Sequence, residues 1–290
     1  MPDTNFVIFT DSGCDINAEL LKKWGVLSLD LSFRFDGEDK EYANSDMSVK
    51  MFYDKMRGGA VAKTSAINTA VFEEAFENIL KQGKDVLYLG FSSNLSTTYN
   101  CAKMAAQNLA EKYTDNKVIT VDTLAASAGQ GMLVYFASQK RTEGNSIEQT
   151  AEYIESIKLK LCHWFTVNDL VYLKRGGRVS SAAAFVGTVL NIKPILHVDN
   201  EGRLISKAKV RGRKMTLKYL CNKYGELAQD KKDGTVYICH ADCIEDANVL
   251  CDMLKSNYGA NVDVITDIGP VIGAHSGPGT LAVFFIGYER

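Results

Sequence analysis

Long apolar runs are absent from this sequence, and none approaches the roughly 20 residues that a membrane-spanning helix needs. We therefore expect no membrane-spanning segment. An excess of positive charge is also missing, because 33 Lys and Arg residues stand against 35 Asp and Glu residues, for a net charge of −2. This balance argues against nucleic-acid binding over a broad surface. The first residues lack the basic start and apolar centre of a secretory signal.

A cysteine framework is lacking as well. The seven cysteines are an odd number and are scattered through apparent helices and strands, which is not the pattern of a disulfide-stabilised domain. We expect reduced thiols in a cytoplasmic protein. Residues 239–243, Cys-His-Ala-Asp-Cys, have metal-binding side chains, but no second ligand pair with zinc-type spacing accompanies them. No metal site is predicted.

The composition is that of a globular protein, with 46% hydrophobic and 23% charged residues in 290. This length suits one large or two ordinary domains. The first half alternates strand and helix signals and predicts a mostly parallel, Rossmann-like α/β sheet. The second half groups its strands with fewer helices between them, which predicts a mixed α+β sheet. We place the domain boundary near residue 160, with an N-terminal domain over 1–160 and a C-terminal domain over 161–290.

Two local patterns give more detailed expectations. Apolar and polar residues alternate strictly over residues 27–35, which predicts one half-buried strand. Asn68 precedes a segment with apolar residues on one helical face, so we expect a helix that Asn68 caps.

A cluster of hydroxyl side chains follows the apolar run at residues 86–91. Its members are Ser92, Ser93, Ser96, Thr97 and Thr98. A helical pattern comes directly after them, and the N-terminus of a helix binds anions through free backbone N–H groups. Serine and threonine also cap ordinary helices, which is the alternative. The loop holds no His, Lys or Asp that could activate a hydroxyl, so it indicates binding rather than catalysis.

Thr64 and Ser65 precede the helix that Asn68 caps. In a parallel sheet the loops after successive strands gather at one edge, so we expect these residues to meet Ser92 and Ser93 around one anion. Residues 11–15, Asp-Ser-Gly-Cys-Asp, end the first strand at the same edge. Their two carboxylates allow metal or acid–base chemistry, but turn and capping roles are favoured.

A glycine-rich segment near the C-terminus contains His275. Residues 269–280 hold four glycines and two prolines, and His275 is the titratable residue among them. Glycine permits close approach of the backbone to a ligand. We therefore favour a functional role for His275 over a purely structural one.

Basic residues gather in two segments, 173–178 and 207–214. Lys207, Lys209, Arg211 and Arg213 alternate in the second, which suits a solvated edge strand protected from aggregation. The competing interpretation is a docking surface for an acidic partner, made by Arg175, Arg178 and Arg211. No aromatic residues alternate with these bases, so nucleic acid is not expected.

Taken together and in order, these motifs resemble the DegV family of bacterial fatty-acid-binding proteins. The matching segments are 11–12, 63–65, 92–96, 173–178, 193–196, 210–213, 269–275 and 277–280. They span nearly the whole chain. The family usually has proline where this chain has Ile67 and glycine where it has Thr97, and these departures affect the two hydroxyl loops.

The resemblance implies two α/β domains with a long-chain fatty acid between them. By residue, it places the carboxylate against Thr64, Ser65, Ser93 and His275, with Ser92 beside them. It further implies no cofactor and no catalytic machinery of the protein's own. The acyl chain would be presented to a separate fatty acid kinase, which forms an acyl phosphate for phospholipid synthesis. Hydroxyls, backbone N–H groups and an imidazole would supply the donors that a buried carboxylate requires.

Two other functions stay open from the residues alone. The first is a serine hydrolase with Ser93 as nucleophile and His275 as base, which needs an orienting carboxylate such as Asp11 or Asp267. The sequence lacks the Gly-x-Ser-x-Gly elbow of one large hydrolase class. The second is a regulatory module in which lipid is only structural.

Overall fold

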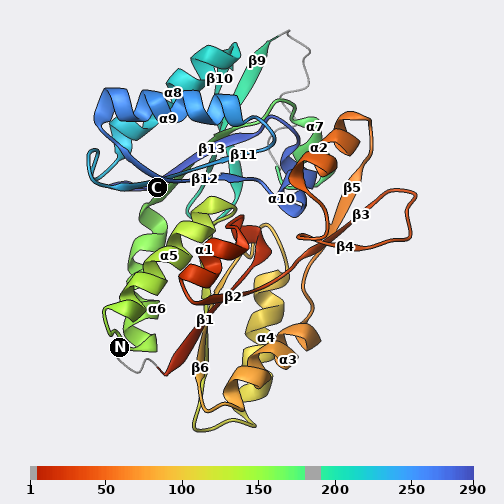
Figure 1. Cartoon of the computed structure of the whole chain (residues 1–290), viewed down its shortest axis with the longest axis vertical. Coiled ribbons are helices and arrows are strands. Elements are labelled where there is room, and N and C mark those ends of the chain that lie inside the picture. The colour runs from red at the N-terminus through yellow and green to blue at the C-terminus, as the bar shows by residue number, and fades with distance from the viewer. Residues whose placement is uncertain (1–4, 180–190) are drawn as a thin grey trace.

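The computed structural model describes residues 5–179 and 191–290 and contains three β-sheets flanked by helices (Figure 1). In the view of Figure 1 most of the N-terminal half lies below, its segment with α2, β3, β4 and β5 lies at the right, and a larger sheet from the C-terminal half lies above. In the described part of the chain, no helix is both long and apolar enough to cross a membrane. All seven cysteines are unpaired.

Sheet A forms the centre of the N-terminal half and is parallel throughout, in the order β2-β1-β6-β7. Its strands are β1 (Phe6–Asp11), β2 (Val26–Leu29), β6 (Asp85–Gly90) and β7 (Val118–Asp122). Helices α3 (Thr69–Leu80) and α4 (Thr98–Ala110) pack together, as do α5 (Ala128–Thr142) and α6 (Ile147–Ile157). Helix α1 (Ala18–Lys23) leads into β2. The parallel α/β expectation is confirmed, and Asn68 caps α3 through the Val71 N–H group at 3.1 Å.

Sheet B is a small antiparallel sheet beside it, in the order β4-β3-β5. Its strands are β3 (Ser32–Phe35), β4 (Tyr42–Ala43) and β5 (Ala62–Ser65), and α2 (Val49–Arg57) covers them. The single strand expected over residues 27–35 is wrong. The chain leaves sheet A after Leu29, the partner of Asp11, because β1 turns there into the 3-10 helix η1 (Ser12–Cys14). Leu31 then donates its N–H group to Ser12 Oγ at 2.9 Å.

Sheet C has six strands in the order β10-β9-β8-β13-β11-β12 and is mixed. They are β8 (Leu161–Thr166), β9 (Ile192–Val198), β10 (Leu204–Arg211), β11 (Thr235–His240), β12 (Asn261–Asp267) and β13 (Leu281–Ile286). Helices α8 (Arg213–Leu227) and α9 (Ile244–Tyr258) cover its outer face (Figure 1). The short helices α7 (Val171–Arg175) and α10 (Pro270–Ser276) pack together beside it. The 3-10 helix η2 (Lys158–Lys160) precedes β8, and the division near residue 160 stays a prediction.

The basic strand β10 lies at the edge of sheet C, as expected of a solvated edge. Lys207, Lys209 and Arg211 are exposed along it. Arg213 does not share their face, because it begins α8 and its Nε atom pairs with Asp246 at 2.8 Å.

The inner face of sheet C packs against the N-terminal half and shares its core. This face includes Leu161, Phe165, Leu196, Tyr237, Cys239, Ala282 and Phe284. A separate apolar core fills the space between sheet C and helices α8 and α9. Burying a large apolar side chain contributes about 1.5–3 kcal/mol, so the junction between the halves is stable except where the packing leaves a cavity.

Candidate functional site

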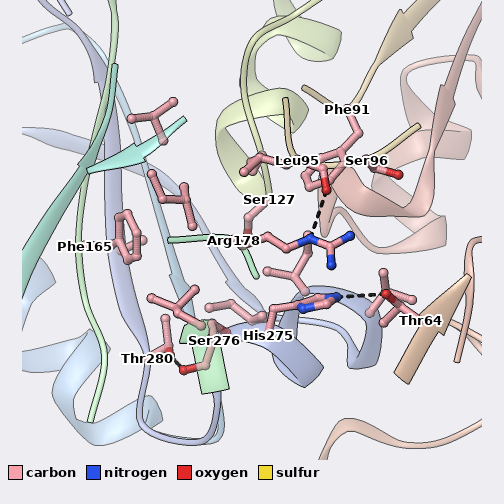
Figure 2. Close-up of a pocket in the computed structure, with 18 of the residues that line it drawn as sticks. Thr64, Phe91, Leu95, Ser96, Ser127, Phe165, Arg178, His275, Ser276 and Thr280 are labelled. Atoms are coloured by element: carbon pink, nitrogen blue, oxygen red, sulfur yellow. Dashed lines mark hydrogen bonds between the residues drawn. The ribbon is translucent and has the colours of Figure 1, made fainter. Parts of the chain in front are cut away.

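A cavity of about 270 Å³ lies between the inner face of sheet C and the loops of the N-terminal half (Figure 2). Its volume is close to the roughly 300 Å³ at which small-molecule sites begin. Most of its walls are apolar, with lining residues that include Leu31, Phe91, Leu95, Phe165, Leu173, Val198, Leu204, Val271, Ala282 and Phe284. Polar side chains gather at one end of it, where Arg178, His275 and Thr64 lie near one another (Figure 2).

His275 lies in the last turn of α10 and forms the centre of the polar end. Its Nε2 atom is 2.8 Å from Thr64 Oγ1. Its Nδ1 atom has no hydrogen-bond partner among residues 5–179 and 191–290. Burial lowers the pKa of His275 to about 4, and the positive charge of Arg178 adds to this effect. The ring is therefore neutral near pH 7.

Two glycines allow the close packing around His275. A Cβ atom at Gly273 would lie 2.3 Å from the Tyr53 hydroxyl oxygen, so only glycine lets α10 approach α2 this closely. A Cβ atom at Gly176 would lie 2.1 Å from His275 Nδ1. The glycine-rich segments singled out in the sequence thus position the imidazole. The functional role predicted for His275 stays a prediction, but its place in the cavity wall agrees with it.

Thr64 and Ser65 also line the cavity, although they do so by a route that differs from the expected one. They are the last residues of β5 in the antiparallel sheet B, where Thr64 pairs with Phe33. The expectation that they follow a strand of the parallel sheet is wrong. The periodicity of the sequence did not reveal the small sheet B, and it is this sheet that places Thr64 next to His275.

The hydroxyl loop after β6 contributes different residues from the expected pair. Ser92 is fully buried and donates its hydroxyl to the Gly202 carbonyl at 2.9 Å. Ser93 donates its backbone N–H group to Asp122 Oδ1 at 3.3 Å. Neither belongs to the cavity lining, whereas Ser96 and Thr97 do. Contact of Ser92 and Ser93 with a carboxylate stays an untested prediction that this geometry does not favour.

Nothing in the sequence distinguishes Ser96 from the other hydroxyl residues of the loop, but its backbone position in the structure does. The N–H groups of Leu95 and Ser96 both donate to the Ser92 carbonyl, so the chain turns tightly between these serines. Ser96 Oγ then accepts the Thr98 N–H group at 3.2 Å, where α4 begins. Ser96 therefore sits at the helix start, the anion-binding position that the loop as a whole had suggested.

Asp11 is a structural residue of the same loop. It is fully buried, and its Oδ2 atom accepts the Tyr88 hydroxyl at 2.6 Å and the Phe91 N–H group at 3.1 Å. Oδ1 accepts the Gly13 N–H group at 3.0 Å. Burial raises the pKa of Asp11. These bonds match the turn role that was favoured for residues 11–15, and they fix the start of the hydroxyl loop.

Arg178, which we expected on a docking surface, lines the cavity instead. Its Nε atom donates to the Leu95 carbonyl at 3.1 Å (Figure 2). Nη1 donates to the Gly176 carbonyl at 2.5 Å. Gly177, with φ of 67°, supplies the left-handed turn that directs the chain inward. The side chain is half-buried and desolvation lowers its pKa. Arg175 and Arg211 are exposed, and their docking role stays a prediction.

Buried hydrogen bonds join the two halves of the chain around the cavity. Ser92 bonds to Gly202 as described, the Tyr53 hydroxyl donates to the Ile268 carbonyl at 2.9 Å, and Asp15 Oδ1 accepts the Gly269 N–H group at 2.9 Å. We call these three the junction bonds. Burial raises the pKa of Asp15 to about 7.

The structure does not bring together the residues that the serine hydrolase alternative requires. Ser93 lies outside the cavity lining that contains His275. Asp11 bonds to Tyr88 and Phe91, while Asp267 lies 3.5 Å from His240 Nδ1. In the described part of the chain, no carboxylate forms a hydrogen bond with His275. The described residues also contain no cluster of three or more potential metal ligands.

Comparison with known proteins gives the family. The family model described as "Uncharacterised protein, DegV family" matches residues 5–287. A DegV domain-containing protein of Clostridium perfringens is 45% identical over 283 residues, which are 97% of each chain. The chain belongs to the DegV family.

Solved DegV structures share this fold. A DegV family protein of Thermus thermophilus, described for its fatty acid binding, is 30% identical with a TM-score of 0.88, over 98% of this chain and 100% of its own. A DegV lipid-binding protein of Thermotoga maritima is 29% identical with a TM-score of 0.87, over 99% and 100%. DegV of Bacillus subtilis, described as a fatty acid binding protein, is 26% identical with a TM-score of 0.85, over 98% and 100%. The predicted fold class is confirmed.

The two departures from the usual DegV motifs fit this structure without strain. Thr97 has φ of −75° and ψ of −6°, which any residue adopts, so the position does not require glycine. Ile67 is buried in the core at 5% exposed, where packing holds the Thr64–Ser65 loop in place of a proline ring.

Proposed function

We propose that this DegV family chain binds a long-chain fatty acid in the cavity. The carboxylate lies among Arg178, His275, Thr64 and Ser96, and the acyl chain runs along the inner face of sheet C. One observation carries the proposal: a single cavity joins apolar walls to an end with one guanidinium, one imidazole and several hydroxyls. The fatty-acid-binding relatives named above support the same ligand class.

The electrostatics of the polar end suit a carboxylate. An ionised carboxylate is costly to bury without a partner, and a planar guanidinium is the side chain best matched to it. Nε and Nη1 of Arg178 donate to the carbonyls of Leu95 and Gly176. These bonds fix the orientation of the guanidinium and leave Nη2 as the remaining donor. When Nε2 of His275 carries the ring proton and donates it to Thr64, the threonine hydroxyl is free to donate to the ligand. Ser65, at the end of β5, lines the same cavity, but its side chain also hydrogen-bonds to the Glu41 carboxylate.

We further propose that the bound headgroup is presented to a separate fatty acid kinase, as the family resemblance implies. Ser65 and Thr97 line the cavity and are exposed, so the polar end lies near solvent. Arg175 and Arg211 are exposed and suit an acidic partner. In this role the chain has no catalytic machinery or cofactor of its own, acts in the cytoplasm, and supplies acyl phosphate for phospholipid synthesis.

Lipid extraction tests the first step. Protein purified without detergent is denatured in solvent, and the extract is analysed by mass spectrometry for acyl chains. We expect one fatty acid per protein, and delipidated protein should take up added fatty acid. Recovery of no acyl chain together with no uptake would contradict the proposal.

A reconstituted assay with ATP and a fatty acid kinase tests the second step. Charge reversal at Arg175 and Arg211 should slow acyl phosphate formation while fatty acid binding is unchanged. The same variant with a full rate would refute docking through these residues, and labelling of Ser93 by a fluorophosphonate would favour the hydrolase instead.

A further inference from the structure

A second hollow, a groove of about 1020 Å³, lies between the two halves of the chain. It shares no lining residue with the cavity proposed for the fatty acid. Helix α1, the end of β2 and the start of α2 form one side of it, and the ends of β11 and β12 form the other. Its volume is at the upper end of the range of small-molecule sites, about 300–1,000 Å³. The proposed fatty acid site makes no use of it.

Acidic side chains outnumber basic ones along this groove. The acids among its lining residues are Asp15, Asp30, Asp242 and Asp267. The base among them is Lys50, which pairs with Asp54 at 2.7 Å, and Asp54 is not part of the lining. Asp242 pairs with Arg57. The groove is therefore left with a net negative charge.

The other three acids have no cationic partner within the described part of the chain. Neither Asp15, Asp30 nor Asp267 forms an ion pair with a lysine or an arginine there. They come from three different elements, because Asp15 follows η1, Asp30 follows β2 and Asp267 ends β12. The described residues contain no cluster of three or more potential metal ligands. One metal ion therefore does not serve these acids together, and separate cationic groups are needed to match them.

His240, at the end of β11, is an independent sign of a ligand. Its side chain is 8% exposed and lines the groove. Nδ1 is buried 3.5 Å from Asp267 Oδ1, and because a carboxylate only accepts, this contact favours a hydrogen on Nδ1. Burial lowers the pKa of His240, which favours the neutral ring.

The other ring nitrogen of His240 is then an acceptor. Nε2 forms no hydrogen bond with the described residues, and it is not among their fully buried atoms that lack a partner. It is therefore accessible from the groove, unlike Nδ1. A mostly buried acceptor without a partner requires an explanation, and an N–H group of a ligand in the groove supplies one.

We propose that this groove binds a linear polyamine, an organic cation whose ammonium groups are separated by methylene chains. Separate ammonium groups pair with Asp30 and Asp267, one on each side of the groove, and an N–H group meets His240 Nε2. The methylene chains pack on the apolar residues of the lining, which include Leu29, Met47 and Ile265. An ammonium group offers only donors, so it matches a site that offers acceptors. This proposal does not depend on the fatty acid.

Isothermal titration calorimetry of the whole chain with spermidine tests the proposal. The titrations are made at one low ionic strength, because salt screens such pairs. We expect one spermidine to bind per chain. Butylamine and magnesium chloride should bind about tenfold more weakly or not at all, because neither places cationic groups on both sides of the groove.

Variants locate the binding. Asp30→Asn and Asp267→Asn should each weaken spermidine binding by about threefold, the effect of one exposed ion pair, and the double variant by about tenfold. His240→Phe keeps a ring and removes the acceptor, and it should weaken binding by about fivefold. Asp263→Asn is the matched control, because Asp263 is an exposed acid of the same strand β12 outside the groove lining. It should bind spermidine as the wild type does.

The outcomes separate a built site from a diffuse attraction between charges. No binding, equal weakening in Asp263→Asn and Asp267→Asn, or butylamine binding as tightly as spermidine would overturn the proposal. Wild-type affinity in the double variant would do the same, with thermal unfolding used to verify that the variant is folded. A trilysine peptide that displaces spermidine and binds more tightly would assign the groove to a basic protein segment instead.

Discussion

Replacing Arg178 by methionine tests the charge that we assign to the headgroup site. Among the described residues that line the cavity, Arg178 is the one with a permanent positive charge. Methionine keeps much of the aliphatic stem and removes the guanidinium. We expect the fatty acid to bind more weakly, because its carboxylate loses a charge-assisted hydrogen bond.

The size of the loss follows from the position of the side chain. A hydrogen bond to a charged group contributes about 1.5–3 kcal/mol, which corresponds to a loss of about 10- to 100-fold in affinity. The half-exposed position keeps the effect within this range, because solvent screens the pair. Arg178→Lys should recover only part of it, since an ammonium lacks the planar fork that matches a carboxylate.

The assay is titration of delipidated protein with a fatty acid and with its methyl ester. The ester carries no charge, so Arg178→Met should weaken its binding by less than about threefold. Arg175→Met is the matched control, because Arg175 is exposed in the preceding turn, and its affinity should equal that of the wild type. Equal losses for acid and ester, or wild-type affinity for the acid, would refute the assignment.

Three further predictions concern the same end of the cavity. Ser96→Ala should weaken fatty acid binding about 5- to 10-fold in the titration above, whereas Ser93→Ala should change it little; the reverse order would support the original assignment to Ser93. Gly176→Ala should displace His275, destabilise the fold by about 1–3 kcal/mol in chemical denaturation and weaken binding, whereas Gly177→Ala, at a left-handed position with open space around it, should cost about 1 kcal/mol and leave binding intact. Because burial lowers the pKa of His275 from 6.5 to about 4, the unfolded chain takes up a proton there that the folded chain does not. The wild type should therefore lose stability as the pH falls from 6.5 to 4, by about 1.4 kcal/mol for each pH unit, and His275→Gln should not lose it. A difference in stability between the two proteins that does not change with pH would show that the ring is not buried as a neutral group.

The periodicity of apolar residues predicted the regular elements of sheet A. It failed at residues 27–35, where the chain passes from sheet A to sheet B. Sheet A follows from alternating strand and helix signals, each of which is local. The break after Leu29 could not be predicted, because its neighbour in the sheet, β1, ends at Asp11, which is 18 residues earlier in the chain. The alternation of apolar and polar residues matches the burial in β3, where Phe33 and Phe35 are buried, but not in β2, where Leu27 is 44% exposed. It also does not reveal that the two strands belong to different sheets.

The sequence predicted which segments reach the candidate site, but not which of their side chains line it. Thr64, Ser65 and His275 line one cavity, as the family resemblance implied. The choice of Ser96 over Ser92 depends on the Gly202 carbonyl, which is 110 residues away. Arg178 is predicted from its basic segment to dock a partner, and that role stays a prediction; its place in the cavity wall depends on the turn at Gly177, which the sequence pattern does not reveal.

The junction bonds bear on how fast a lipid could leave. If the two halves had to separate for release, all three bonds would break together, at about 1 kcal/mol each. That alone would make the separated state about 100-fold rarer, and the apolar contacts of sheet C with the N-terminal half would reduce it further. Release by this route would therefore pass through a rarely populated open state, and removing a junction bond should speed lipid exchange.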